Sequence, residues 1–142
     1  MAILDASVYV ALVNAHEKEH ARCWAWFEQV QASGERVMAP VILLAEVAAA
    51  LSRGMGDTAL TQRVVQQLTR STVIELIPVT RRIANQAAAI AATHRIRGCD
   101  AIYVALAQQS AERVVTLDRQ QLERGAAIVE TCEPWDWQSR LA

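Results

Sequence analysis

Short apolar stretches alternate with longer helical segments along this chain, and this alternation restricts its fold more than any other feature. Residues 2–5 predict a short buried strand, and residues 6–14 predict a helix that follows at once. The later predicted strands are 36–39, 73–79, 113–117 and 126–129; the later predicted helices are 17–32, 40–53, 57–70, 80–94, one beginning near residue 100, and a helical turn over 119–123. This order predicts an α/β fold with a central, mostly parallel sheet covered by helices on both faces.

The length and composition favour one compact domain. The chain has 142 residues, of which 53% are hydrophobic, and no flexible linker divides it. We therefore expect a single domain over residues 1–142. The longest apolar run, residues 37–51, is interrupted by Pro40 and Glu46 and is shorter than the roughly 20 residues of a membrane span. The widely spaced cysteines predict no disulfide framework, and the apolar start lacks a basic segment, so we expect a cytoplasmic protein without a membrane partner.

Three aspartates lie where a helix is predicted to begin. Asp5 ends a predicted strand, Asp118 follows another, and Asp100 leads the apolar run of residues 101–106. Each of them is well placed to cap the helix that follows, which is a common role of Asp at this position. However, ligand sites of open α/β sheets lie at the carboxyl ends of the strands, so the same residues can also face one crevice.

Glu46 is the acid that a purely structural role explains least well. Its five neighbours on each side are all apolar, and a helix that is apolar nearly all round is buried. A buried carboxylate needs a partner, a proton or a metal ion. An ion pair with Arg53, two turns further along, is one solution. A cluster of Glu46 with the three aspartates is another, and it would need a hard cation such as Mg²⁺ or Mn²⁺ to offset the repulsion.

Four segments together resemble the signature segments of the PIN-domain ribonucleases. They are Ile3–Ser7, Pro40–Leu51, Cys99–Ala107 and Thr116–Arg119, and their order and intervals match over essentially the whole chain. The likeness is greatest to VapC-type toxins of type II toxin–antitoxin systems. It implies a PIN-like three-layer α/β/α domain, an acidic pocket that binds Mg²⁺ or Mn²⁺, and hydrolysis of RNA phosphodiester bonds by a metal-activated water. It also implies an antitoxin partner and a homodimer.

The resemblance also implies roles for the four acids. Asp5 and Asp100 would be the principal metal ligands. Glu46 and Asp118 would complete the site, either directly or through water. All four positions carry the acid that the family pattern requires.

Four further residues are candidates for supporting roles. Ser7 and Thr116 match small hydroxyl positions that help to hold the pocket of the family. Arg97 and Arg119 lie close to two of the acids in the sequence. They could bind substrate phosphates, or they could be ordinary solvated charges.

Two other functions compete with this interpretation. Residues 16–20 match the H-E-x-x-H pattern of zinc peptidases, in which His16 and His20 would bind zinc and Glu17 would act as the base. These residues lie at the charged start of a helix, and no third ligand is evident. The second alternative is a non-catalytic PIN-like module that binds RNA or protein, against which the intact acids argue. The net charge of −1 permits a nucleic-acid partner, since 13 of the 14 basic residues are arginine.

The tryptophans have two possible roles. Trp24, Trp135 and Trp137 can pack at the edge of the domain. Alternatively, they can form a surface for a dimer mate or an antitoxin peptide, because tryptophan often anchors interfaces.

Overall fold

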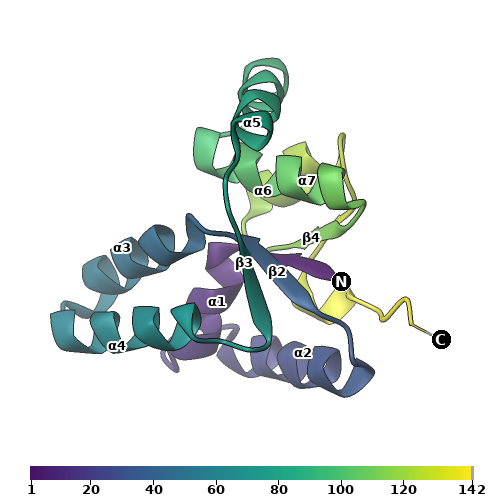
Figure 1. Ribbon diagram of the computed structural model, residues 1–142. Helices are drawn as coiled ribbons and strands as arrows, with labels where there is room; N and C mark the ends of the chain where they lie inside the picture. Colours follow the sequence, from purple (N-terminus) through teal and green to yellow (C-terminus); the bar gives the residue numbers. More distant parts are fainter. Residues whose placement is uncertain (142) are drawn as a thin grey trace.

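A five-stranded sheet in the order β3-β2-β1-β4-β5 runs through the centre of the computed structural model, which describes residues 1–141 (Figure 1). The strands are β1 (Ala2–Leu4), β2 (Val37–Pro40), β3 (Ile74–Ile77), β4 (Arg113–Val115) and β5 (Thr131–Cys132). Every pair of neighbouring strands is parallel, which confirms the predicted sheet.

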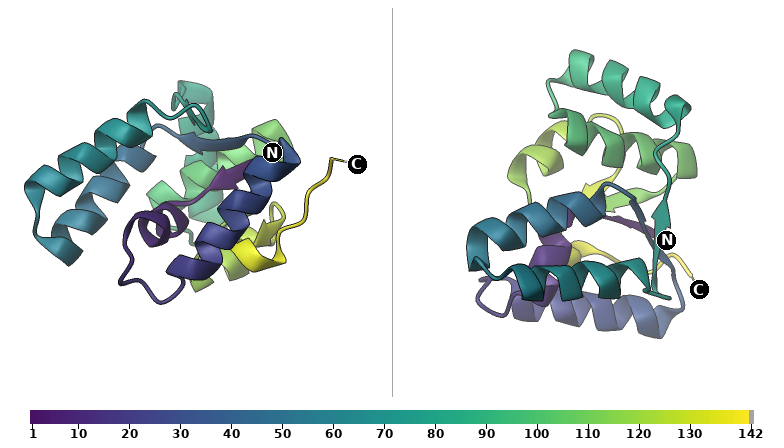
Figure 2. Two further views of the ribbon diagram at one scale, coloured as in Figure 1. Left: turned by 90° about the horizontal axis from the view of Figure 1, so that it is seen from below. Right: turned by 60° about the vertical axis from the view of Figure 1, so that its left-hand side comes forward.

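Helices cover both faces of the sheet and give the predicted three layers. Figures 1 and 2 show α5, α6 and α7 on one side and α1 to α4 on the other. Helix α6 packs directly on β1, β2 and β4, and α5 packs on α6. The helices are α1 (Ala6–Val13), α2 (His20–Ser33), α3 (Leu43–Met55), α4 (Thr58–Thr69), α5 (Arg81–His94), α6 (Gly98–Ser110), α7 (Arg119–Gly125) and the short 3₁₀ helix η1 (Pro134–Asp136). Within residues 1–141, none of the helices is long and apolar enough to cross a membrane.

Strand β1 lies at the middle of the sheet and of the hydrophobic core. Its three residues are fully buried between β2 and β4, with Ile3 in register with Met38 and Val114. A strand that is buried on both faces has to be apolar throughout, and this one is. Because β1 is rigidly held, the residue that follows it, Asp5, is placed at the carboxyl end of the sheet.

The prediction of a last strand over residues 126–129 is wrong. The amides of Ile128 and Val129 both donate to the carbonyl of Gly125, so this segment forms the turn that ends α7. The chain rejoins β4 only afterwards, when Val114 donates to Glu130 at 2.9 Å, and the strand is Thr131–Cys132. The run 126–129 is apolar enough for a strand, but local hydrogen bonds to the end of the helix use its amides.

Three helices begin elsewhere than predicted. The third helix begins at Leu43 rather than Pro40, because Pro40 remains in β2, the amide of Val41 donates to Ile77 of β3 at 2.8 Å, and Val41 and Ile42 form a turn. Helix α2 begins at His20 rather than residue 17, because Asn14 accepts a side-chain hydrogen bond from the amide of residue 16 and starts a turn. Helix α6 begins at Gly98, two residues before the predicted start.

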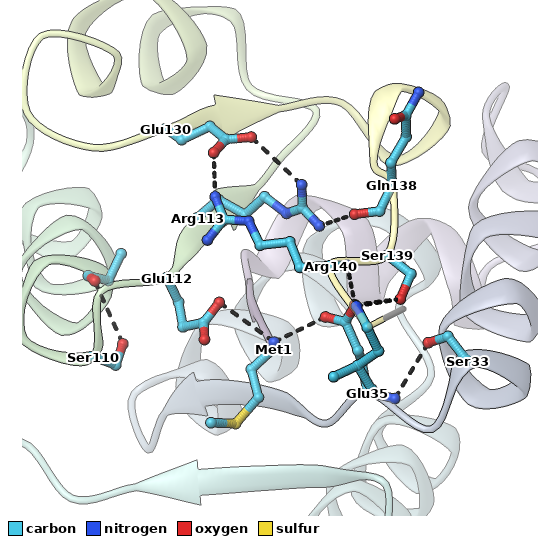
Figure 3. A network of polar contacts seen from close by, with 12 residues as sticks. Met1, Ser33, Glu35, Ser110, Glu112, Arg113, Glu130, Gln138, Ser139 and Arg140 are labelled. Atoms are coloured by element: carbon cyan, nitrogen blue, oxygen red, sulfur yellow. Dashed lines mark hydrogen bonds and ion pairs between the residues drawn. The ribbon is translucent and has the colours of Figure 1, made fainter.

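Residues 133–141, which follow β5 and are called the strap below, pack across the edge of the domain. Trp137 is 2% exposed, and the guanidinium of Arg113 lies 5.2 Å from its ring centroid. Arg113 also donates to the carbonyl of Gln138 and pairs with Glu130 (Figure 3). Trp137 therefore packs at the domain edge, as one of its two interpretations predicted.

Two more contacts hold the strap against the rest of the protein. The buried side chain of Glu35 accepts hydrogen bonds from the hydroxyl of Ser139 and from the amide of Arg140, each at 2.6 Å (Figure 3). Trp135 lies against Arg22 of α2, with the guanidinium carbon 3.4 Å from its ring centroid. The strap thus joins α2, β4 and the segment that precedes β2.

We expect Trp137→Ala to lower the free energy of unfolding by about 3–5 kcal/mol, because it empties a large buried volume. Urea denaturation followed by circular dichroism measures this. Trp135→Ala is the matched control and should cost about 1 kcal/mol or less, because it removes mainly one cation–π contact near the surface. Equal losses for the two variants would contradict this description of the strap.

Candidate active site

One pocket at the carboxyl end of the sheet collects all four predicted acids. Its volume is about 400 Å³, and the polar or charged residues that line it are Asp5, Ser7, Glu17, Glu46, Arg53, Arg97, Asp100 and Asp118. The acids come from four different elements of the fold. Asp5 follows β1, Glu46 lies in the first turn of α3, Asp100 lies in the first turn of α6, and Asp118 precedes α7.

Asp5 is both a helix cap and a wall of the pocket. It is 5% exposed, and its Oδ2 accepts three hydrogen bonds: from the amide of Ser7 at 3.2 Å, from the Ser7 hydroxyl at 2.5 Å and from the Thr116 hydroxyl at 3.0 Å. In the described part of the chain, no donor reaches Oδ1. The capping role therefore uses one oxygen and leaves the other for a ligand in the pocket.

The hydroxyls of Ser7 and Thr116 connect the two strand ends that carry Asp5 and Asp118. Ser7 Oγ accepts from the amide of Leu117 at 3.0 Å and lies 3.3 Å from Thr116 Oγ1. Thr116 Oγ1 in turn accepts from the amide of Asp118 at 3.0 Å. Since each hydroxyl both donates and accepts, the pair fixes the distance between β1 and β4 at the pocket.

Glu46 points into the pocket without the ion pair that one interpretation predicted. Among residues 1–141, Arg53 makes no ion pair with Glu46, and the buried Oε1 of Glu46 has no hydrogen-bond partner. The buried hydroxyl of Tyr103 is close enough to lower the pKa of Glu46, although it makes no hydrogen bond of ordinary geometry. Glu46 is thus a buried acceptor still in need of a donor or a cation.

Burial and mutual repulsion make these carboxylates reluctant to ionise. Burial raises the pKa of Asp5, the hydrogen bonds from Ser7 and Thr116 offset only part of this shift, and the charge of Asp100 adds to it. Burial also raises the pKa of Glu46, with a further increase from Asp5 and Asp100. Without a cation, ionisation of Asp5 and of Glu46 is therefore disfavoured.

Arg97 supplies the positive charge that lies among these acids. Its Nε donates to Asp100 Oδ2 at 2.8 Å, and one of its terminal nitrogens donates to Asp118 Oδ2 at 3.0 Å. Asp118 uses its other oxygen, Oδ1, to cap α7 by accepting from the amides of Gln120 and Gln121. Asp118, like Asp5, therefore combines a capping role with a place in the pocket.

The donor set fits a hard divalent cation. Mg²⁺ and Mn²⁺ prefer carboxylate oxygens, and here the four predicted acids and Glu17 line one pocket, with the Oε1 atom of Glu46 unpartnered among the described residues. As the side chains stand, no three His, Cys, Asp or Glu residues of the described chain are grouped tightly enough to hold a metal ion. Asp100 and Asp118 are instead held by Arg97. Asp5, Glu46, Asp100 and Asp118 could therefore bind a metal ion once Arg97 moves.

Two charged residues of the pocket, Glu17 and Arg53, were not predicted to line it with the four acids, and one predicted site residue lies outside it. Arg53 lies two turns from Glu46 on α3, and that spacing was the signal for it. Glu17 carries no such signal, because it belongs to the turns between α1 and α2. Arg119 begins α7 and lines a neighbouring hollow with Glu123 and Glu133 rather than the acidic pocket.

The H-E-x-x-H segment does not form a helical zinc motif. His16 is exposed in the turn before α2, whereas His20 is the first residue of that helix, so the two do not share a helical face. The Nδ1 atom of His20 lies 2.7 Å from the carbonyl oxygen of Ala11. Glu17 instead reaches the acidic pocket.

Comparisons with known proteins agree with this fold and site. The PIN domain model matches residues 2–127, and the chain therefore belongs to the PIN domain family. No curated protein matches the sequence significantly.

Several solved structures share the fold. VapC20 of Mycobacterium tuberculosis, described as a toxin that cleaves the sarcin–ricin loop, has a TM-score of 0.73 and 21% identity, over 89% of this chain and 95% of its own. FitAcB from Neisseria gonorrhoeae has a TM-score of 0.71 and 22% identity, over 96% and 100%. VapBC2 from Rickettsia felis, bound to a fragment of promoter DNA, has a TM-score of 0.71 and 14% identity, over 93% and 97%.

We expect Glu46→Gln to stabilise the protein in the absence of divalent ions. Burial raises the pKa of Glu46 in the folded state. Below the unfolded pKa this group does not affect stability, and the free energy of unfolding falls as the pH rises from the unfolded pKa through the folded pKa. The variant should gain about 1 kcal/mol at pH 8, because it removes a buried charge without a partner. The gain should shrink toward pH 4.5.

Urea denaturation in EDTA at the two pH values measures this gain. Glu28→Gln is the matched control, since Glu28 is exposed on α2, and it should change stability equally little at both pH values. A loss of stability in Glu46→Gln at pH 8 would mean that the carboxylate is satisfied in the folded protein.

Proposed function

We propose that the protein is a Mg²⁺- or Mn²⁺-dependent endoribonuclease and the cytoplasmic toxin of a VapBC-like toxin–antitoxin pair. The observation that carries the proposal is that Asp5, Glu46, Asp100 and Asp118, from four different elements, meet in one pocket of a PIN domain. The names of structures with the same fold support the biological role: one is a toxin that cleaves the sarcin–ricin loop, and another is a toxin–antitoxin complex from Klebsiella pneumoniae.

The proposed chemistry divides the pocket residues into two groups. Asp5, Glu46, Asp100 and Asp118 would hold the ion, directly or through water. When bound, the ion would lower the pKa of a coordinated water and offset charge on the phosphate. Oδ1 of Asp5, which no donor reaches within residues 1–141, and Oε1 of Glu46 would accept hydrogen bonds from the attacking water and orient it.

The remaining pocket residues would position the acids and the substrate. Ser7 and Thr116 keep Asp5 in place through its Oδ2 atom. Arg53 lies in the same pocket without a carboxylate partner in the described chain, and it can bind an RNA phosphate. The substrate phosphodiester would enter the open side of the pocket, with the two basic side chains Arg53 and Arg97 at its walls.

An RNA cleavage assay tests the proposed reaction. We expect cleavage with Mg²⁺ or Mn²⁺ and none in EDTA. Asp5→Asn and Asp100→Asn should each lower the rate at least about 100-fold, because loss of a group that only supports a metal ligand already costs 10- to 100-fold. Glu28→Gln, far from the pocket, is the control and should cleave like the wild type. Cleavage that survives both Asp substitutions would refute the site.

The antitoxin partner has a candidate contact surface on the other side of α1. A pocket of about 410 Å³ is lined by Tyr9, Trp24, Phe27 and Val73 among others, and Trp24 is 41% exposed at its rim. An exposed aromatic beside an apolar pocket is typical of a protein interface. We assign this pocket to an apolar segment of the antitoxin, and we also propose that the protein forms a homodimer.

Coexpression with the product of a small gene immediately upstream, which a toxin–antitoxin pair requires, tests this assignment through cell growth. We expect the small protein to relieve growth arrest by the wild type but to relieve it poorly for Trp24→Ala. Trp135→Ala, on the strap, is the control and should be neutralised like the wild type. Full neutralisation of Trp24→Ala would exclude this pocket as the main contact.

A further inference from the structure

We propose that Arg97 is an exchangeable counter-ion: it neutralises two acids of the ion-free pocket, and it moves to a substrate phosphate when a divalent ion enters. The inference rests on the proposed function, since it concerns the same ion and the same RNA. It goes further by coupling the two binding events through one side chain.

The position of Arg97 between two acids is the first observation. Its guanidinium bridges Asp100 at 2.8 Å and Asp118 at 3.0 Å, and each acid contributes its Oδ2 atom. Asp100 lies in α6, whereas Asp118 caps α7, so the bridge is not a local helical pair alone. A planar fork of donors suits this geometry, whereas a lysine ammonium cannot reproduce it.

The second observation is that the bridge is exposed. The side chain of Arg97 is 67% exposed, whereas those of Asp100 and Asp118 are 10% and 28% exposed. Exposed ion pairs contribute little, because water competes for both partners. A divalent ion that uses the same carboxylate oxygens also repels the guanidinium. The bridge therefore occupies the Oδ2 atoms of both acids in the ion-free pocket and is weak enough for a divalent ion to displace.

A displaced Arg97 remains at the edge of the same pocket. Its backbone lies immediately before α6, which fixes the base of the side chain while the guanidinium is free to turn outward. An RNA phosphate beside the acids is the anion that this position can reach, and a guanidinium binds phosphate oxygens in pairs. Glu17 also lines the pocket and disfavours an anion at its own edge. The phosphate is thereby left to the part of the pocket lined by Arg53 and Arg97.

Arg53 provides the matched control for both steps. It lines the same pocket and carries the same charge, but it makes no ion pair with the acids in the described residues. Arg53→Gln therefore removes one positive charge without removing a competitor for the acid oxygens. A comparison of Arg97→Gln with Arg53→Gln therefore separates the effect of losing the ion pairs with Asp100 and Asp118 from the effect of losing one positive charge in the pocket.

Ion binding tests the first step without any measurement of catalysis. Titration calorimetry with Mn²⁺ alone should give Arg97→Gln an affinity about tenfold higher than the wild type, corresponding to two exposed ion pairs that no longer have to be broken. Arg53→Gln should change the affinity much less, and Arg97→Lys should fall between the wild type and Arg97→Gln. Unchanged Mn²⁺ affinity in Arg97→Gln would overturn the inference, as would an equal change in Arg53→Gln.

RNA binding tests the second step. Fluorescence anisotropy with a short labelled RNA, in Ca²⁺ and in EDTA, should show that Arg97→Gln weakens binding about tenfold with Ca²⁺ and hardly at all in EDTA, because only a freed guanidinium offers charged hydrogen bonds to phosphate. Arg53→Gln should weaken binding under both conditions. A gel at the end of each titration verifies that the RNA is intact. Equal losses of Arg97→Gln with and without Ca²⁺ would overturn the exchange.

These outcomes are distinct from failure of the proposed function. A wild type that binds Mn²⁺ and cleaves RNA, together with an Arg97→Gln variant that binds Mn²⁺ with unchanged affinity, overturns the exchange alone. A wild type that binds no Mn²⁺ overturns the proposed function and the exchange with it. Urea denaturation of each variant verifies folding, and Arg97→Lys keeps the test available if Arg97→Gln folds poorly.

Discussion

Repulsion among buried carboxylates is the constraint on which the rest of this structure depends. Four strand and helix ends bring negative groups into one pocket, and burial makes the charges of Asp5 and Glu46 costly there. The protein offsets the cost locally. Three hydrogen bonds fall on one oxygen of Asp5, two backbone amides bind one oxygen of Asp118, and Arg97 takes the remaining oxygen of Asp118. A divalent cation would bind the carboxylate oxygens that remain without a donor in the described residues, above all Oε1 of Glu46.

The sheet and the strap keep this arrangement from relaxing. Strand β1 is fully buried between two parallel neighbours, and its last residue directly precedes Asp5. At the first residue of β4, the strap packs Trp137 against the guanidinium of Arg113. Because β4 leads to Thr116 and Asp118, packing at the far edge of the domain helps to fix the pocket. Repulsive groups stay close only where the backbone that carries them cannot move apart.

Capping and ligand roles turn out to be compatible, although the sequence presents them as alternatives. Asp5 and Asp118 each cap a helix with one oxygen and turn the other toward the pocket or toward Arg97. A carboxylate has two oxygens, and a helix N-terminus at the end of a parallel strand points one of them at the crevice. The cap therefore orients the acid and does not compete with its role in the pocket. The zinc motif of residues 16–20 has no such support, because its two histidines lie on either side of the start of α2.

The sequence by itself determined the alternation of strands and helices, the burial of β1 and the four acids of the pocket. These follow from short-range patterns, namely apolar runs and the acids that end or interrupt them. Only the tertiary structure decided that Arg97 bridges Asp100 and Asp118, that Glu17 and Arg53 join the pocket while Arg119 does not, and that β5 lies at residues 131–132 rather than 126–129. Such features depend on where loops distant in sequence meet. Local hydrogen bonds and side-chain directions set those positions, and hydrophobic periodicity does not encode them.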